Sequence, residues 1–323
     1  MRGQTMRGRW GRGAAAAACV AFAASCGSSG HGGEGLGSVG DDGGAGSSGG
    51  SSGSSGSSSG NVFGDGGTSS GGGGGAGCAQ AAEFVYVVDV SGNLYQFNPP
   101  TLAFTQVGQV TCASSDFFSM AVDRNAVAWV LAQDGSIVKY DINAKTCAKT
   151  SFAVGQQGFQ TFGMGFSADS AGGSTDTLFV TDDELLAPGT NRGLARIDTT
   201  SLALAPVGQY DQLKGVEAEL TGTGDGRLFG AFEGSPYTVA EIDKTTAHII
   251  SVAPQTGINY PPSSSSLAFA FWGGDFWLFI GPGGTTDVFQ YQPSTQGTTK
   301  RETEQFEIVG AGVSTCAPTT PPQ

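Results

Sequence analysis

One short pattern recurs five times after residue 78, and it constrains the fold more than any other feature of the sequence. In each copy, alternating apolar and polar residues run into a polar turn, and a second stretch of the same kind follows. The turn opens at a polar residue in every copy: Asn98, Asp141, Asp198, Asp243 and Gln292. The copies are therefore 43, 57, 45 and 49 residues apart. Because side chains alternate between the two faces of a β-strand, each copy predicts two strands joined by a turn.

Further apolar stretches complete the copies. One strand is predicted directly before the paired strands of every copy, at 84–90, 126–131, 177–181, 227–232 and 276–280. Another is predicted before that one in the last four copies, at 117–122, 159–166, 216–220 and 266–271. A repeat of about 40–50 residues that contains only strands indicates the blades of a β-propeller.

The first copy lacks its opening strand, and the C-terminus supplies a spare one. This strand is predicted at 312–316, after a last outer strand at 304–309. Pairing it into the first blade would remove the open sheet edges that promote aggregation. The sequence therefore predicts an all-β fold, a single β-propeller of five four-stranded blades closed by the C-terminal strand. The long spacing of 57 residues before the third copy leaves six blades as the alternative.

Over residues 79–318 the pattern resembles the β-propeller superfamily. It is nearest to bacterial surface propellers with repeats of the Asp-Thr-Thr/Ser type, which Asp198-Thr199-Thr200-Ser201 matches here. The resemblance is architectural, and no Trp-Asp or kelch double-glycine signature recurs. Propellers host both binding proteins and enzymes, so the resemblance implies a fold without naming a ligand.

Residues 1–25 have the features of a bacterial export signal. Four arginines are followed by an apolar run of 11 residues, Ala14 to Ala24, which is too short to span a bilayer. Small residues directly before Cys26 resemble the lipobox of bacterial lipoproteins. That resemblance implies that Cys26 is lipidated and anchors the protein in the cell envelope, facing the periplasm or the cell surface. The alternative is a plain secretory signal in which Cys26 is incidental.

A composition change then divides the chain. Residues 27–77 hold 24 glycines and 14 serines among 51 residues, so they have almost nothing to bury. We expect 26–77 to comprise the lipidated cysteine and a disordered linker, 78–318 the propeller domain, and 319–323 a disordered tail. The chain after residue 26 carries 11 basic and 28 acidic residues, a net charge of −17. Nucleic acid requires a basic surface, so it is excluded as a partner.

Four cysteines remain if the signal is removed and Cys26 is lipidated. An even number in an exported chain suggests disulfides, and four cysteines allow three connectivities. We favour Cys78–Cys316, which would join the chain ends where the ring closes. The second pair is then Cys112–Cys147, which would join the outer parts of the first two blades. A zinc site is disfavoured because no Cys-x-x-Cys spacing occurs.

The search for catalytic chemistry yields little. His248 is the one histidine of the predicted domain, and no Gly-x-Ser-x-Gly motif accompanies it, so serine-hydrolase chemistry is disfavoured. Asp182, Asp183 and Glu184 open the longest loop between strands and form a candidate acidic site. Carboxylates there could serve a glycosidase or bind calcium. However, adjacent residues at a strand end point to opposite faces, so the sequence sets no carboxylate pair.

These observations predict a membrane-anchored lipoprotein that displays a monomeric propeller and binds a protein or saccharide partner without catalysis. No resident cofactor or catalytic residue is expected, calcium being the weaker alternative. A lyase, lactonase or glycosidase built on the acidic loop is the second interpretation. A structural component of the envelope is the third.

Overall fold

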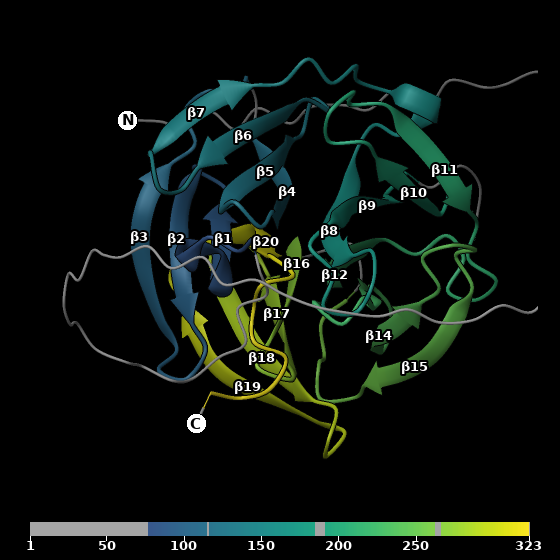
Figure 1. The fold of residues 1–323 in the computed structure, drawn as a ribbon. Helices are drawn as coiled ribbons and strands as arrows, with labels where there is room; N and C mark the ends of the chain where they lie inside the picture. Colours follow the sequence, from purple (N-terminus) through teal and green to yellow (C-terminus); the bar gives the residue numbers. More distant parts are fainter. Residues whose placement is uncertain (1–76, 115, 185–190, 262–265, 323) are drawn as a thin grey trace, which may run out of the picture. The chain divides into compact units, whose positions relative to one another are not determined.

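The computed structural model describes residues 77–114, 116–184, 191–261 and 266–322. Within them, five four-stranded antiparallel sheets are arranged as blades around a central axis, as Figure 1 shows. The prediction of a five-bladed propeller is confirmed, and the six-bladed alternative is wrong. Helical structure in the described ranges is limited to two 3₁₀ turns, η1 (Gln80–Glu83) and η2 (Gln156–Gly158). Neither is long and apolar enough to cross a membrane.

Each blade runs from an innermost strand outward. The strands of blade 1 are β20 (Ile308–Val313), β1 (Val85–Asp89), β2 (Asn93–Asn98) and β3 (Ala103–Gln109). Those of blade 2 are β4 (Phe117–Val122), β5 (Val127–Ala132), β6 (Ile137–Asp141) and β7 (Thr146–Lys149). Those of blade 3 are β8 (Phe162–Ala168), β9 (Asp176–Asp182), β10 (Leu194–Ile197) and β11 (Leu204–Gly208).

The last two blades follow the same order. The strands of blade 4 are β12 (Ala218–Gly222), β13 (Leu228–Phe232), β14 (Tyr237–Ile242) and β15 (Ile249–Gln255). Those of blade 5 are β16 (Ser266–Trp272), β17 (Asp275–Gly281), β18 (Thr286–Gln292) and β19 (Gly297–Glu304). The innermost strands β20, β4, β8, β12 and β16 contact one another in that order around the axis.

The C-terminal strand closes the ring, as the sequence predicted. β20 pairs antiparallel with β1, with Val85 opposite Val313 and Val88 opposite Gly310. The predicted bounds were wrong, because the last outer strand ends at Glu304 and the closing strand spans Ile308–Val313 rather than 312–316. The expected topology is therefore correct, with the closing strand about four residues earlier in the chain.

The hydrophobic core lies between blades. Five clusters of buried side chains each combine residues from two neighbouring blades. For example, Phe97 of blade 1 packs edge-on against Trp277 and Phe279 of blade 5, with ring centroids 5.1 and 5.4 Å apart. A single four-stranded sheet cannot cover both of its faces, so each blade depends on its neighbours for burial.

Glycines let the innermost strands approach closely. A Cβ atom at Gly163 of β8 would lie 2.1 Å from the carbonyl oxygen of Ala218 on β12. A Cβ atom at Gly222 of β12 would lie 2.2 Å from the carbonyl oxygen of Phe166 on β8. Real Cβ atoms do not come so close to backbone, so blades 3 and 4 contact through main chain at these points.

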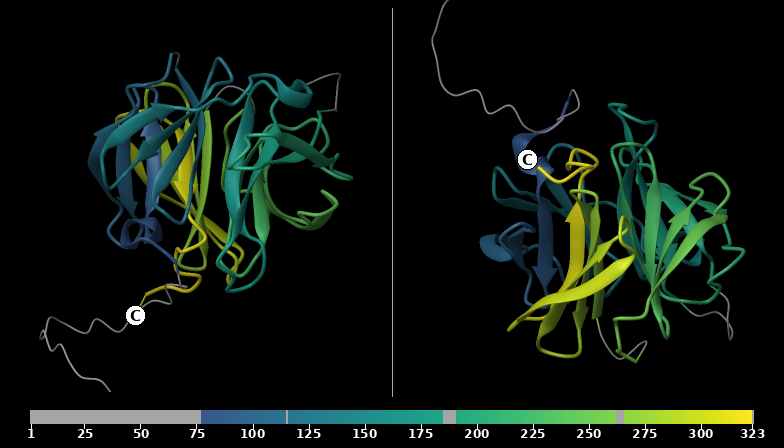
Figure 2. Two further views of the ribbon diagram at one scale, coloured as in Figure 1. Left: turned by 45° about the horizontal axis from the view of Figure 1, so that its top comes forward. Right: turned by 90° about the horizontal axis from the view of Figure 1, so that it is seen from below.

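The chain ends meet at one end of the propeller, where the first described residues and the C-terminus lie together in Figure 2. Cys78 and Cys316 form a disulfide there with a Cα–Cα distance of 5.9 Å, which confirms the favoured pairing. Ser314 Oγ donates to the carbonyl oxygen of Ala82 and accepts from the amide of Cys316. This end of the ring is thus held by strand pairing, a disulfide and hydrogen bonds together.

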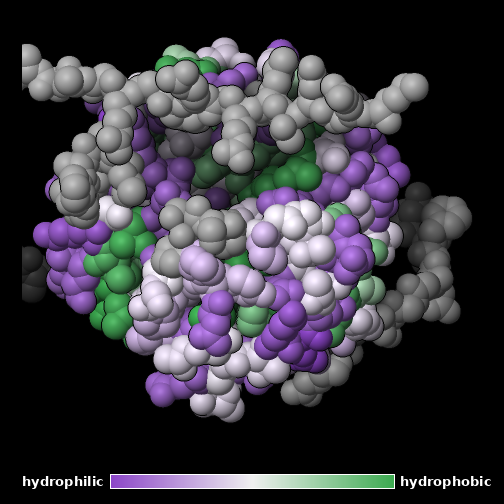
Figure 3. Space-filling view, turned by 180° about the vertical axis from the view of Figure 1, so that it is seen from behind, coloured by the Kyte–Doolittle hydropathy of each residue, from purple (hydrophilic) through white to green (hydrophobic). Residues whose placement is uncertain are grey.

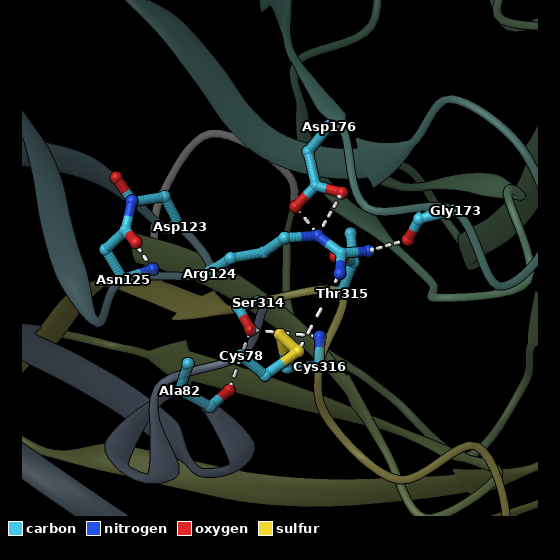
Figure 4. Close-up of a disulfide and its surroundings, with 10 residues drawn as sticks. All are labelled: Cys78, Ala82, Asp123, Arg124, Asn125, Gly173, Asp176, Ser314, Thr315 and Cys316. Carbon is cyan, nitrogen blue, oxygen red and sulfur yellow. Dashed lines mark hydrogen bonds and ion pairs between the residues drawn. A yellow bond between two sulfur atoms is a disulfide. The ribbon is translucent and has the colours of Figure 1, made fainter. Parts of the chain in front are cut away.

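Arg124 extends this network into blades 2 and 3, as Figure 4 shows. It lies in the turn after β4, and its Nε donates to Asp176 Oδ1 at 2.7 Å. Its Nη2 donates to the carbonyl oxygen of Gly173 at 2.7 Å, and its Nη1 lies 3.7 Å from Cys78 Sγ. The second oxygen of Asp176 accepts from the hydroxyl of Thr315. The buried side chain of Arg124 therefore links blades 2 and 3 to Cys78, near the start of the domain in the sequence. Through Asp176 it also links them to Thr315, near the C-terminus.

The second disulfide also matches the prediction. Cys112 follows β3 and Cys147 lies on β7, with their Cα atoms 5.7 Å apart. The bond joins the outer strands of blades 1 and 2 and encloses a much shorter loop, with a sequence separation of 35 against 238.

We expect a Cys78→Ala/Cys316→Ala double variant to fold but to lose about 2–5 kcal/mol of unfolding free energy, because the long unfolded loop becomes unconstrained. The matched Cys112→Ala/Cys147→Ala variant should lose about 1–2 kcal/mol less, since its loop is shorter. Urea unfolding under oxidising conditions measures both. An equal or larger loss in the second variant would contradict this ordering.

Candidate functional site

The topology brings two sets of residues together at the other end of the propeller. All innermost strands begin there, and the strands that pair with them end there. In four blades, the residue after the second strand donates its amide to the carbonyl oxygen of the residue before the innermost strand. These pairs are Val90 to Glu307 (3.0 Å), Gln133 to Asp116 (2.8 Å), Asp183 to Thr161 (3.3 Å) and Glu233 to Glu217 (2.8 Å).

All of these residues except Thr161 line a cavity of about 350 Å³, which we call the channel mouth. Figure 3 views the propeller from this end: hydrophobic residues lie in a hollow near the middle of the face, with hydrophilic residues around it. The cavity is lined by Val90, Asp116, Phe117, Phe118, Gln133, Asp183, Glu217, Ala218, Glu219, Glu233, Ser266, Leu267, Glu307 and Val309. Its volume lies in the range of ordinary ligand pockets.

The channel mouth is strongly acidic. Six of its lining residues carry carboxyl groups: Asp116, Asp183, Glu217, Glu219, Glu233 and Glu307. Of the described residues that line it, none is Lys, Arg or His. Glu219 and Glu233 are 5% and 8% exposed, so part of this charge lies in a medium of low dielectric. Like charges in such surroundings disfavour one another's ionisation.

Asp183 is the carboxyl group most clearly affected. Burial, and to a lesser degree the neighbouring charges of Glu217 and Glu233, raise the pKa of Asp183 to about 7. A hydrogen bond from the Thr161 hydroxyl opposes this rise in the pKa. Asp183 therefore gains and loses its proton near neutral pH.

Glu219 lies deeper, on β12. Its Oε2 accepts a 2.7 Å hydrogen bond from Ser119 Oγ of β4, and burial raises its pKa well above the ordinary value. Burial also raises the pKa of Glu217. The structure thus places the carboxyl group with the strongly raised pKa beneath the rim of the channel mouth.

The predicted acidic loop divides between two faces. Asp182 is fully buried and does not line the mouth. Its carboxylate accepts a hydrogen bond from the backbone amide of Arg192 at 2.7 Å and forms an ion pair with Nη1 of the Arg192 side chain at 3.2 Å. Glu184 accepts from the same Nη1 at 2.8 Å. Of the three candidates only Asp183 lines the channel mouth, as expected for neighbours at the end of a strand.

Sequence reasoning missed Glu217, Glu219, Glu233 and Glu307 as site residues. A usable signal was present, because three of them directly precede an innermost strand or follow a second strand. Asp116 and Asp183 occupy equivalent positions in other blades. Superposing the repeats by strand order would therefore have placed five of the six acids on one rim.

Two further polar residues, His248 and Asp89, have local partners and do not line the mouth. His248 is exposed and its Nδ1 lies 2.7 Å from Asp211 Oδ2. Asp89 accepts from the amides of Ser91 and Asn93, and therefore caps the β1–β2 turn. The described residues hold no group of three His, Cys, Asp or Glu arranged to bind a metal ion, so the calcium hypothesis gains no support.

A second cavity of about 260 Å³ lies between blades 4 and 5. Phe229, Phe271, Phe276 and Tyr291 line it, and all four are nearly buried. Arg227 forms a paired hydrogen bond with Glu241 on its wall, with distances of 2.8 and 2.7 Å. Because these two charges compensate each other and the rings pack together, we interpret this cavity as imperfect packing between blades.

No protein-family model matches the sequence, and a comparison with curated proteins finds no match. Among solved structures, the chain is similar to one in a nidogen/laminin complex, with 10% identity and a TM-score of 0.45, covering 71% of this chain and 97% of that one. It is also similar to TolB from Acinetobacter baumannii, with 13% identity and a TM-score of 0.39, covering 68% of this chain and 51% of that one. These similarities are too weak to indicate a function for this chain.

The raised pKa of Asp183 predicts a pH-dependent stability. The folded state holds this proton up to about pH 7, whereas the unfolded chain releases it near 3.8, so the unfolding free energy falls as pH rises between these values. Asp183→Asn keeps the position neutral. We expect the variant to gain about 1–3 kcal/mol over the wild type across this range, after allowance for solvent screening. Urea unfolding at a series of pH values measures the difference.

Asp198→Asn is the matched control. Asp198 is exposed and the amides of Ser201 and Thr200 lower its pKa, so its stabilising effect is lost as pH falls. The control should therefore be less stable than the wild type at neutral pH, and this difference should disappear in acid. An Asp183→Asn variant that follows the wild type at every pH would contradict the assignment.

Proposed function

We propose that this chain is an exported lipoprotein whose propeller binds a protein partner at the channel mouth and catalyses no reaction. The observation that carries the proposal is the acidic cavity of about 350 Å³ formed by the strand ends. The two disulfides suit an oxidising compartment such as the periplasm or the cell exterior. Lipidation of Cys26, which lies outside the described residues, supplies the anchor in this proposal.

The position of the mouth supports a binding role. The described chain begins at Gly77 and joins the ring through Cys78, at the end opposite the cavity. A linker that attaches there does not itself cover the channel mouth, so a partner could reach the cavity.

The charge of the mouth favours a partner with basic groups. Six carboxyl groups without a basic residue among the described lining attract a lysine or arginine side chain more strongly than a neutral sugar. The apolar residues Phe117, Leu267 and Val309 lie among the acids and can pack against the methylene stem of such a side chain. A saccharide partner therefore becomes the less favoured form of this proposal.

Binding of an oligolysine peptide should fall about tenfold or more in a Glu217→Gln/Glu233→Gln variant, because two carboxylates of the rim are lost. Isothermal titration at low ionic strength measures this, and added salt should weaken the wild-type interaction. A neutral oligosaccharide of similar length serves as the alternative probe.

An Asp141→Asn/Asp243→Asn variant is the matched control. It removes the same amount of charge at exposed turns of blades 2 and 4, and it should bind the peptide as the wild type does. Equal weakening in both variants would show that only the overall negative charge matters. Binding of the neutral oligosaccharide alone would replace the protein partner with a saccharide.

The anchor has its own test. Cys26→Ser should move the protein from the membrane fraction to the soluble fraction, because several acyl chains hold a protein on a membrane and an unacylated chain lacks them. Fractionation followed by immunoblotting measures the shift. Unchanged membrane retention would overturn the lipoprotein assignment and leave the binding proposal intact.

One observation favours an enzyme as the second candidate. Asp183, with its pKa of about 7, could act as a general acid or base beside Glu217 in the cavity. Turnover of aryl glycosides or lactones that is lost in Asp183→Asn would establish this function. Asp182 is a poor test residue, because its substitution would leave Arg192 without its buried partner.

A further inference from the structure

A buried hydrogen-bonded chain joins three innermost strands just below the channel mouth. The amide of Met164 on β8 donates to Ser119 Oγ on β4 at 3.1 Å. The Ser119 hydroxyl donates in turn to Glu219 Oε2 on β12 at 2.7 Å. Ser119 and Met164 are fully buried, and Glu219 is 5% exposed. Because β8 lies between β4 and β12 in the ring, this chain connects blades 2, 3 and 4 through two side chains and one backbone amide.

The surroundings of Glu219 oppose a negative charge. Its own strand presents Glu217, the end of β9 presents Asp183, and the end of β13 presents Glu233. Asp116 before β4 and Glu307 before β20 complete the acids of the same cavity. Among the described residues that line this cavity, none is Lys, Arg or His, and Arg192 after β9 is bound to Asp182 and Glu184. Burial, and then the charges of Asp183 and Glu233, raise the pKa of Glu219, while hydrogen bonds from the Ser119 hydroxyl and the Met164 amide oppose the rise.

A neutral Glu219 fits this position, since it accepts from Ser119 without bringing a charge into the ring. An ionised Glu219 would need water or a cation, and the channel mouth is the adjoining space from which water can enter. Solvation of the carboxylate would compete with the bond to Ser119. It would thereby release the hydroxyl that holds the Met164 amide.

We propose that the contacts between blades 2, 3 and 4 at the channel mouth respond to pH. The three innermost strands stay packed while Glu219 carries its proton, and their contacts loosen when that proton is released to solvent. Disulfide Cys78–Cys316 and the Arg124 network lie at the other end, so the loosening is confined to the mouth. This inference concerns the ring itself and does not depend on which partner binds. Failure of the proposed binding function would therefore leave it standing.

Hydrogen exchange of the Met164 amide in the full chain tests the proposal. After correction for the intrinsic rate, exchange should be about tenfold faster or more at about pH 9 than at about pH 6. Glu219→Gln keeps a neutral acceptor for Ser119 and should remain protected at both pH values. Ser119→Ala removes the hydroxyl acceptor of the Met164 amide, which should then exchange faster than in the wild type at about pH 6.

Glu83→Gln makes the same chemical change in η1, which precedes β1, and should keep the wild-type pH response. Thermal unfolding of each variant confirms that it is folded before exchange is compared. A wild-type Met164 amide with equal corrected protection at both pH values would overturn the proposal. So would a Glu219→Gln variant that opens with pH as the wild type does.

Discussion

Pairing of β1 with β20 is the interaction on which the rest of the propeller depends. Every cluster of the core lies between two blades, so a ring open at any point would expose the facing sides of two sheets. The β1–β20 ladder joins segments more than 200 residues apart, and its loop-closure entropy must be offset by all five interfaces together. The same ladder sets the register of β20 on β1, and hence places Glu307 beside Val90 on the rim.

The repeat made the number of blades, the strand order and both disulfides predictable, because strand alternation and turn chemistry are local properties of the chain. The closing strand was misplaced for a physical reason. The connection at 305–307 contains no Gly, Pro, Asn or Asp, so the predicted outer strand runs through it, whereas the predicted break falls at Gly310, which lies inside β20 together with Gly312. Those glycines are needed because a Cβ atom on either would lie 2.9 Å from backbone atoms of β4.

The candidate site was only partly predictable. Alternation at the end of β9 correctly implied that Asp182 and Asp183 face different ways, but it could not tell which of them faces the axis. Convergence of Asp183 with Glu217 and Glu233 depends on how blades 3 and 4 are set beside each other. That placement follows from the close contact at Gly163 and Gly222, and no local pattern records it. Burial of Glu219 beside Ser119 is a tertiary property of the same kind.

The network around Arg124 has a consequence for the order of assembly. Strand pairing, the Ser314 hydrogen bonds and the bridge from Arg124 to Asp176 all bring the two chain ends together without any covalent bond. Cys78 and Cys316 are thereby held as neighbours by a surface that is already folded. The strands and their hydrogen bonds therefore suffice to bring the chain ends together. The disulfide between Cys78 and Cys316 then stabilises the closed ring.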